Sequence, residues 1–299
     1  MKITVIIPCY HLHFNKINRV LDCHYKNTRK PDQVIISLNG CSNLRKEDIS
    51  VLQKKYKQHF TDFLIIETQT LLNRARARNI CIPYITGDIV CFSDADDEEH
   101  LQRFEIVEYF FKNHDIVHLL HSYILIKCFR YMCGGCVLCK RENYNNNFIQ
   151  YGNLENIKYC EPSILYDINY PSENIKPNVK NILGIVNGEQ IMPVHGLVCV
   201  KKEVFDKIKF NENYPRGQDS LFSQEVLKEF KKTILIESQL HIYDNGWIPK
   251  EDEFNKFILN NGKEILINLG SKNPPKPGTP ITSSEILEIV NSIKSIINY

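Results

Sequence analysis

The stretch that decides the fold reads GDIVCFSDADDEE and occupies residues 87–99. The short apolar run Ile89–Phe92 predicts a buried strand, and a cluster of acidic residues follows it at once. Crowded carboxylates repel one another and raise their own pKa values unless a cation neutralises them. Mg²⁺ and Mn²⁺ prefer carboxylate oxygen, and we therefore interpret Asp94 and Asp96, at the strand end, as a cation or nucleotide site. Residues 97–99 are interpreted differently, as the acidic first turn of a helix over 101–112.

Outward from this stretch, short β-rich runs alternate with longer amphipathic segments. The predicted strands are 3–7, 34–38, 63–66 and 89–92, and the predicted helices between them are 15–24, 45–60 and 73–82. Such alternation predicts an α/β fold, with a mainly parallel sheet flanked by helices. Ligands of these sheets bind at the carboxyl ends of the strands. Pro8, Tyr10 and Asn39, at or just after strand ends, are therefore candidate ligand contacts.

The second half of the chain is less regular. We expect strands at 196–200 and 233–236, helices at 202–208 and 220–230, and loops over 144–180. Residues 271–280 form a proline-rich linker before a last amphipathic helix, whose apolar stripe packs on the chain's own core or, alternatively, on a second copy. The predicted organisation is a first half over 1–100, a second half over 101–250 and a helical tail over 251–299.

Three arginines occur at steps of two in the segment NRARARN, residues 73–79. They cannot share one helical face, so at least one can point toward the strand ends. Arginine recognises phosphates through its planar fork. Arg74 and Arg76 fit a solvated face.

Composition narrows the class of protein. The 299 residues carry 37 Lys plus Arg against 35 Asp plus Glu, a net charge of +2, which argues against a general nucleic-acid binder. The apolar runs are too short for a transmembrane segment, and the start of the chain lacks the pattern of a signal peptide. The odd count of 11 cysteines, several within apolar runs, fits free thiols. We expect a cytoplasmic protein.

Four of these cysteines form a tight run: Cys128, Cys133, Cys136 and Cys139. They could hold zinc or an iron–sulfur cluster. A structural zinc site more often uses two separated pairs, and the Gly134-Gly135 pair suggests a hairpin that sends the cysteines to different faces. Reduced thiols are the default expectation.

The order of several motifs resembles family 2 glycosyltransferases. TVIIPCY (4–10), ARN (77–79) and GDIVCFSDADD (87–97) occur in the family's order, and HGLVCVKKEVF (195–205) followed by GQDSLF (217–222) resembles its downstream segment. The resemblance covers roughly residues 1–245. It implies the GT-A (Rossmann-like) fold and inverting transfer of a sugar from a nucleoside diphosphate sugar, usually UDP-linked, to a hydroxyl acceptor on a glycan, protein or small molecule.

The resemblance also implies roles for particular residues. Arg78 lies at the nucleotide, Asp94 near the ribose, Asp96 on a Mn²⁺ or Mg²⁺ ion, and Asp219 is the general base. Pro8, Tyr10 and Asn39 complete the nucleotide-binding set. The chemistry agrees, because the leaving diphosphate gains charge that a metal ion stabilises, and the acceptor hydroxyl must lose a proton. Without the upstream motifs, Asp219 could equally be a helix N-cap.

Three positions leave the assignment open. The family's uracil-binding aspartate is replaced by Leu38 or Asn39, depending on the alignment, and an Asn amide can still pair with uracil or with another base. Gln218 stands where the family usually has Glu. His241, after the last strand, is either a late metal ligand or a packed strand histidine.

Two other classes of function compete with the enzyme. Loss of the uracil-binding aspartate and the Gln218 change would suit a non-catalytic GT-A-fold module that binds a nucleotide or glycan. A nucleotidyltransferase would open with a glycine-rich loop after its first strand, and residues 8–13 contain no glycine.

Overall fold

The computed structural model describes residues 1–125, 150–164, 182–191, 198–214 and 217–243. The cysteine run 128–139 and the tail 251–299 lie outside the described residues. Two compact units are present, one formed by Met1–Ile124 with Gln150–Ile242 and the other by Leu125–Ile149 with Tyr243–Tyr299. Every candidate site residue lies in the first unit. The predicted division at residue 100 stays a prediction.

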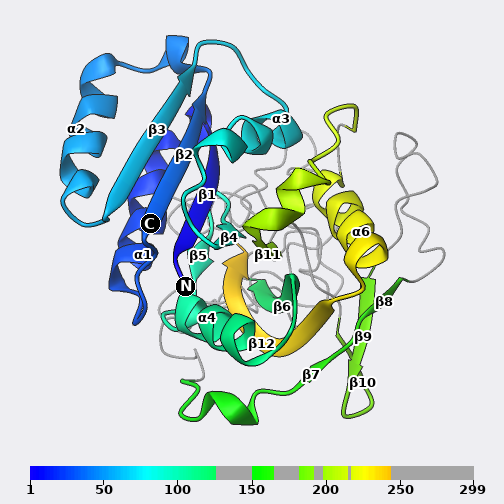
Figure 1. The fold of residues 1–299 in the computed structure, drawn as a ribbon. Coiled ribbons are helices and arrows are strands. Elements are labelled where there is room, and N and C mark those ends of the chain that lie inside the picture. Colours follow the sequence, from blue (N-terminus) through cyan, green and yellow to red (C-terminus); the bar gives the residue numbers. More distant parts are fainter. Residues whose placement is uncertain (126–149, 165–181, 192–197, 215–216, 244–299) are drawn as a thin grey trace, which may run out of the picture. The chain divides into compact units, whose positions relative to one another are not determined.

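The predicted alternation of strands and helices is confirmed in the first hundred residues (Figure 1). Strands β1 (Ile3–Tyr10), β2 (Gln33–Asn39), β3 (Asp62–Thr68) and β4 (Ile89–Phe92) follow one another in the chain. Helices α1 (Ile17–Lys26), α2 (Lys46–Lys57) and α3 (Arg74–Asn79) lie between them in sequence. The strands stand in the order β3-β2-β1-β4, and all three pairs are parallel. Their carboxyl ends therefore meet at one edge of the sheet.

The sheet continues beyond β4 with strands from the second half of the chain. Its further order is β11 (Val198–Lys201), β6 (His118–Leu125), β12 (Thr233–Tyr243) and β5 (Glu98–Glu99), and β7 (Tyr159–Cys160) pairs with β12. β11 is antiparallel to both β4 and β6, and β12 is antiparallel to β5. The sheet is thus parallel from β3 to β4 and turns antiparallel after β4. A second small sheet contains β8 (Ser163–Ile164), β9 (Ile182–Val186) and β10 (Glu189–Ile191).

Strand periodicity divides the core into two layers. In β1 and β2, alternate residues such as Val5 and Val34 belong to one buried cluster, while Ile6 and Ile35 belong to the other. The first cluster includes apolar residues of α1, α2 and α4 (Arg103–Asn113), and the second includes those of α3 and α6 (Gln218–Phe230). Helices therefore cover both faces of the sheet, as a parallel sheet requires.

Several shorter elements connect these layers. The 3-10 helix η1 (His11–Lys16) runs straight from β1 into α1, and η6 (Lys202–Asp206) follows β11. The remaining 3-10 helices among the described residues are η2 (Cys41–Asn43), η3 (Ile82–Tyr84) and η5 (Leu154–Asn156). Within the described part of the chain, no helix has the length and apolar character needed to cross a membrane.

Candidate active site

The ends of β1 and β2 bring Tyr10 and Asn39 together as register partners. The Asn39 side chain is buried and bonds to the backbone: its Nδ2 donates to the Cys9 carbonyl at 3.2 Å, and its Oδ1 accepts the Leu72 N–H at 3.4 Å. Gly40 follows at φ 78°, where a Cβ would lie 2.4 Å from Nδ1 of His11. The Asn39 amide thus holds the strand ends together, and its contact with a nucleobase stays a prediction. Pro8 lies two register pairs before Tyr10 on β1 and is half-buried.

Arg78 is the arginine of the 73–79 segment that points inward. Arg74 and Arg76 are exposed, as the sequence predicted, whereas the Arg78 side chain is only 3% exposed. Its Nη2 lies 3.3 Å from Oδ1 of Asp94, and its guanidinium stands over the ring of Phe210 at 5.3 Å. The Asn73 side chain caps this helix by accepting the Arg76 N–H at 2.8 Å. Two predicted nucleotide-binding residues are therefore in contact at the end of β4.

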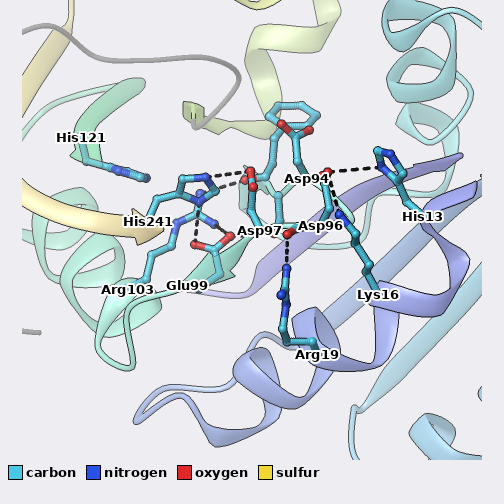
Figure 2. A network of polar contacts seen from close by, with 12 residues as sticks. His13, Lys16, Arg19, Asp94, Asp96, Asp97, Glu99, Arg103, His121 and His241 are labelled. Atoms are coloured by element: carbon cyan, nitrogen blue, oxygen red, sulfur yellow. Dashed lines mark hydrogen bonds and ion pairs between the residues drawn. The ribbon is translucent and has the colours of Figure 1, made fainter. Parts of the chain in front are cut away.

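Asp96 faces the opposite side of the same turn, toward η1 and α1 (Figure 2). Its Oδ2 lies 3.5 Å from Nδ1 of His13 and 3.8 Å from Nζ of Lys16. Arg19 donates to the Asp96 carbonyl, and its Nε lies 3.1 Å from Oε1 of Glu98. Sequence reasoning missed these basic residues, although their spacing of three along 13–19 was a usable signal.

Residues 97–99 do not open a helix, contrary to our interpretation of the sequence. Glu98 and Glu99 form β5, which pairs with His241 and Ile242 of β12, and α4 begins only at Arg103. Asp97 is 1% exposed and contacts Nε2 of His241 at 2.9 Å. Burial raises the pKa of Asp97 to about 7, with Asp94 and Asp96 adding to the rise and His241 opposing it. Asp97 and Glu99 are buried, and both contact His241, which is remote in sequence.

Residues 94–97 form a turn that we call the acidic turn. Glu99, two residues later, is the centre of a buried polar network beside it (Figure 2). Its Oε1 lies 2.6 Å from Nη1 of Arg103 and accepts the Ser93 hydroxyl at 2.6 Å. Arg103 also donates to the Phe92 carbonyl at 2.9 Å, at the end of β4. Burial by itself would raise the pKa of Glu99, but the Arg103 charge together with the contacts of His24 and His241 outweighs burial and holds that pKa well below its usual range. The network ties β4, β5 and α4 together.

His241 is fully buried, and both of its ring nitrogens face carboxylates. Nε2 contacts Asp97, and Nδ1 lies 3.7 Å from Oε2 of Glu99. Burial lowers the pKa of His241, but Asp97 and Glu99 outweigh burial and raise it to about 9. These contacts favour the interpretation of His241 as a packed strand histidine. Its alternative role as a metal ligand stays a prediction.

Asp219 lies in the first turn of α6, half-buried, and its Oδ1 accepts the Ser220 N–H at 2.8 Å. Gly217, at φ 71°, precedes the helix. Phe222, one turn later, stacks on Phe210 at 4.2 Å, the same ring that Arg78 covers. The start of α6 is thereby anchored to the core beside the nucleotide-binding candidates.

The acidic turn offers the donor atoms that a hard cation needs. Asp94 and Asp96 keep 29% and 20% of their side chains exposed, and they raise the pKa of their neighbour Asp97. Among the described residues, no group of three His, Cys, Asp or Glu side chains converges as a metal site. Mg²⁺ usually takes only one or two carboxylates and completes its shell with substrate phosphates and water. Asp96 therefore fits such an ion.

Comparison with known proteins adds independent findings. Residues 4–164 match the sequence model described as Glycosyl transferase family 2. The amylovoran biosynthesis glycosyltransferase AmsB of Erwinia amylovora is 35% identical over 102 residues, which is 34% of this chain and 33% of AmsB. The UDP-Gal:alpha-D-GlcNAc-diphosphoundecaprenol beta-1,3-galactosyltransferase of Escherichia coli is 26% identical over 264 residues, 85% of this chain and 86% of the relative.

Among solved structures, TarS residues 1–349 of S. aureus in complex with UDP superposes with a TM-score of 0.52 at 13% identity. The match covers 99% of this chain and 72% of that one. The same region of TarS in complex with UDP-GlcNAc superposes with a TM-score of 0.53. At this identity the likeness concerns the fold, and it confirms the predicted GT-A architecture.

Proposed function

The chain belongs to glycosyl transferase family 2, and on that premise we propose that it is a metal-dependent, inverting enzyme whose donor is a nucleoside diphosphate sugar, with UDP as the nucleotide. That the chain is a glycosyltransferase follows from the family and from its glycosyltransferase relatives. The observation that carries the finer proposal is the turn Asp94–Asp97, placed at the carboxyl edge of the parallel strands with Arg78 against it. The acceptor is a hydroxyl group on a glycan, a protein or a small molecule.

The donor's nucleoside is assigned to the ends of β1, β2 and β4. Tyr10 and Asn39 are neighbours there, and Arg78 and Asp94 pair across the same edge. The UDP-Gal in the name of the Escherichia coli relative and the UDP bound to TarS support uracil as the base. The Asn39 amide already bonds to backbone groups. We therefore assign contact with the uracil base to Tyr10, Pro8 and nearby backbone groups.

In the proposed reaction, Asp96 holds a Mn²⁺ or Mg²⁺ ion that stabilises the negative charge of the departing nucleoside diphosphate. Arg78, buried beside Asp94, holds that carboxylate in place for the ribose. Asp219 removes the proton of the acceptor hydroxyl as the hydroxyl attacks the anomeric carbon from the face opposite the leaving group. The configuration at that carbon is inverted.

The proposal is tested by release of nucleoside diphosphate from UDP-Gal, UDP-GlcNAc and UDP-Glc, measured with Mn²⁺, with Mg²⁺ and with EDTA. We expect release with one of these donors and loss of release in EDTA. Asp96→Asn should lower release at least tenfold and raise the metal concentration needed. Asp115→Asn is the matched control, because Asp115 is an exposed acid paired only on the surface with Lys232.

Thermal stability measures binding separately from turnover. A nucleotide that binds the native state raises stability by about 2.7 kcal/mol at a hundredfold excess over Kd. UDP, GDP, CDP and dTDP should be compared, each with and without metal. If no nucleotide stabilises the protein under any condition, the donor-site assignment is wrong, and the non-catalytic alternative would need a ligand of another class.

We also propose a cytoplasmic location, because the cysteines among the described residues are all free thiols. Growth of a cell producing the tagged chain, followed by fractionation, would test this.

A further inference from the structure

The segment that links β1 to α1 carries basic side chains on the side that faces the acidic turn. Residues 11–19 read HLHFNKINR and contain no acidic residue. A 3-10 helix has three residues per turn, so His13 and Lys16 of η1 lie on the same side of it. Both side chains point at one oxygen, Oδ2 of Asp96, as Figure 2 shows.

These contacts are poor candidates for a purely structural role. The distances of 3.5 and 3.8 Å exceed those of good charge-assisted hydrogen bonds, and the His13 and Lys16 side chains are 38% and 33% exposed. Ion pairs this exposed contribute between zero and about 1 kcal/mol. Arg19 differs, because it bonds the Asp96 carbonyl and Glu98, and so anchors α1 to the turn. His13 and Lys16 can therefore exchange partners without loss of the fold.

We propose that His13 and Lys16 bind the diphosphate of the donor. This inference rests on the proposed function and adds the residues that recognise the diphosphate. When a divalent cation occupies the Asp96 carboxylate, the carboxylate no longer needs the Lys16 ammonium or the His13 ring as partners. Both can then donate to phosphate oxygens, for which a lysine serves as a point charge and a histidine as an N–H donor. The nucleoside end is held separately, by the Arg78–Asp94 side of the turn.

The test compares ligands that share a nucleoside but differ in phosphate. Affinities of uridine, UMP and UDP are measured by calorimetry for the wild type, Lys16→Gln and His13→Gln, in EDTA and in Mg²⁺. A hydrogen bond to a charged group typically corresponds to roughly tenfold or more in affinity. We expect each variant to bind UDP roughly tenfold more weakly and to bind uridine as the wild type does.

Two further variants sharpen the result. Lys16→Arg keeps the charge and should retain most of the UDP affinity. Lys26→Gln makes the same change at an exposed site at the far end of α1 and should leave every affinity unchanged. Thermal melting of each variant checks that the fold is intact. We expect it to be, because the His13 and Lys16 side chains are partly exposed.

The outcomes separate this inference from the proposed function. If the wild type binds no nucleoside diphosphate, with GDP, CDP and dTDP tried as well, the proposed function fails first. If the wild type binds UDP and the Lys16 and His13 variants bind it equally well, only the diphosphate assignment is wrong. Equal losses for uridine and UDP would also overturn it, because they would show a general disturbance of the site.

Discussion

At the scale of single residues, Gln218 and Asp219 are neighbours in sequence with different surroundings. Gln218 is 2% exposed, and its Nε2 donates to the Tyr214 carbonyl at 2.7 Å. A glutamate carboxylate has no proton to donate to that carbonyl when it is ionised. The exchange of the family's usual Glu for Gln is therefore a local hydrogen-bonding choice. Asp219, the proposed general base, keeps its carboxylate.

Asp219→Asn should abolish transfer while leaving donor binding intact. The Asn side chain can still accept the Ser220 N–H that Asp219 accepts, so the start of α6 is kept. General base catalysis typically contributes 10²–10⁴-fold, and we expect kcat to fall by about that factor. Turnover is measured by nucleotide release in the presence of acceptor, and binding by UDP-induced thermal stabilisation. Unchanged kcat would remove Asp219 from the mechanism.

At the scale of elements, the acidic turn is held by the strand and helix that follow it. Ser93 and Asp94 directly follow β4, and Glu99 lies in β5. Arg103, the first residue of α4, contacts both Glu99 and the Phe92 carbonyl at the end of β4. Glu99 and Arg103 are four residues apart, a spacing visible in the sequence. Their burial could not be predicted from the sequence, because it depends on the pairing of β12 with β5.

Arg103→Met should strongly destabilise the protein. Removing one member of a buried ion pair leaves the other charge uncompensated, which costs about 3–5 kcal/mol. Arg103 and Glu99 are both fully buried, so solvent does not screen the pair. Chemical denaturation gives the change in the free energy of unfolding.

Lys112→Met is the matched control on the same helix, because Lys112, which pairs with Glu108, is 51% exposed. Its cost should stay below about 1 kcal/mol. Equal costs for the two substitutions would contradict the structural role assigned to the Arg103–Glu99 pair.

At the scale of the whole molecule, the buried His118 makes the fold less stable in acid. His118 is fully buried in β6 with its Nδ1 against Oγ1 of Thr233 at 3.1 Å, and burial lowers the pKa of its ring to about 3. The unfolded chain binds this proton near pH 6.5. Between these two values the unfolded state holds more protons, so this site lowers stability as the pH falls from about 6.5 toward 3.

His118→Leu should therefore reduce the acid sensitivity of the fold. One pKa unit corresponds to about 1.4 kcal/mol, so this site accounts for a loss of about 2 kcal/mol between pH 7 and pH 5. The free energy of unfolding at both pH values is compared for the wild type and the variant. Thr233→Val removes the hydrogen-bond partner but keeps the imidazole, and it should keep the pH dependence. If His118→Leu kept the full wild-type pH dependence, His118 would not be the group that titrates.

Much of the architecture follows from local pattern. The four parallel strands were predicted within a few residues because apolar runs of four or five residues are each followed by a polar residue or by Pro. Spacing required only that at least one of the three arginines face the strand ends, and the resemblance of ARN (77–79) to the family's motif singled out Arg78. The strand ends in turn placed Tyr10, Asn39 and Asp94 at one edge.

The partners of these side chains came only from the folded chain. Asp97 meets His241 across 144 residues of sequence, and Asp96 meets Lys16 through the packing of η1 against the turn. Local sequence shows where a carboxylate stands and which secondary structure it favours. Whether that carboxylate caps a helix, lines a binding site or pairs in the core depends on the elements that pack over it. That is why the strands and their parallel arrangement could be predicted from the sequence, while the strand order and the partners of Asp97, Glu99 and Gln218 required the tertiary structure.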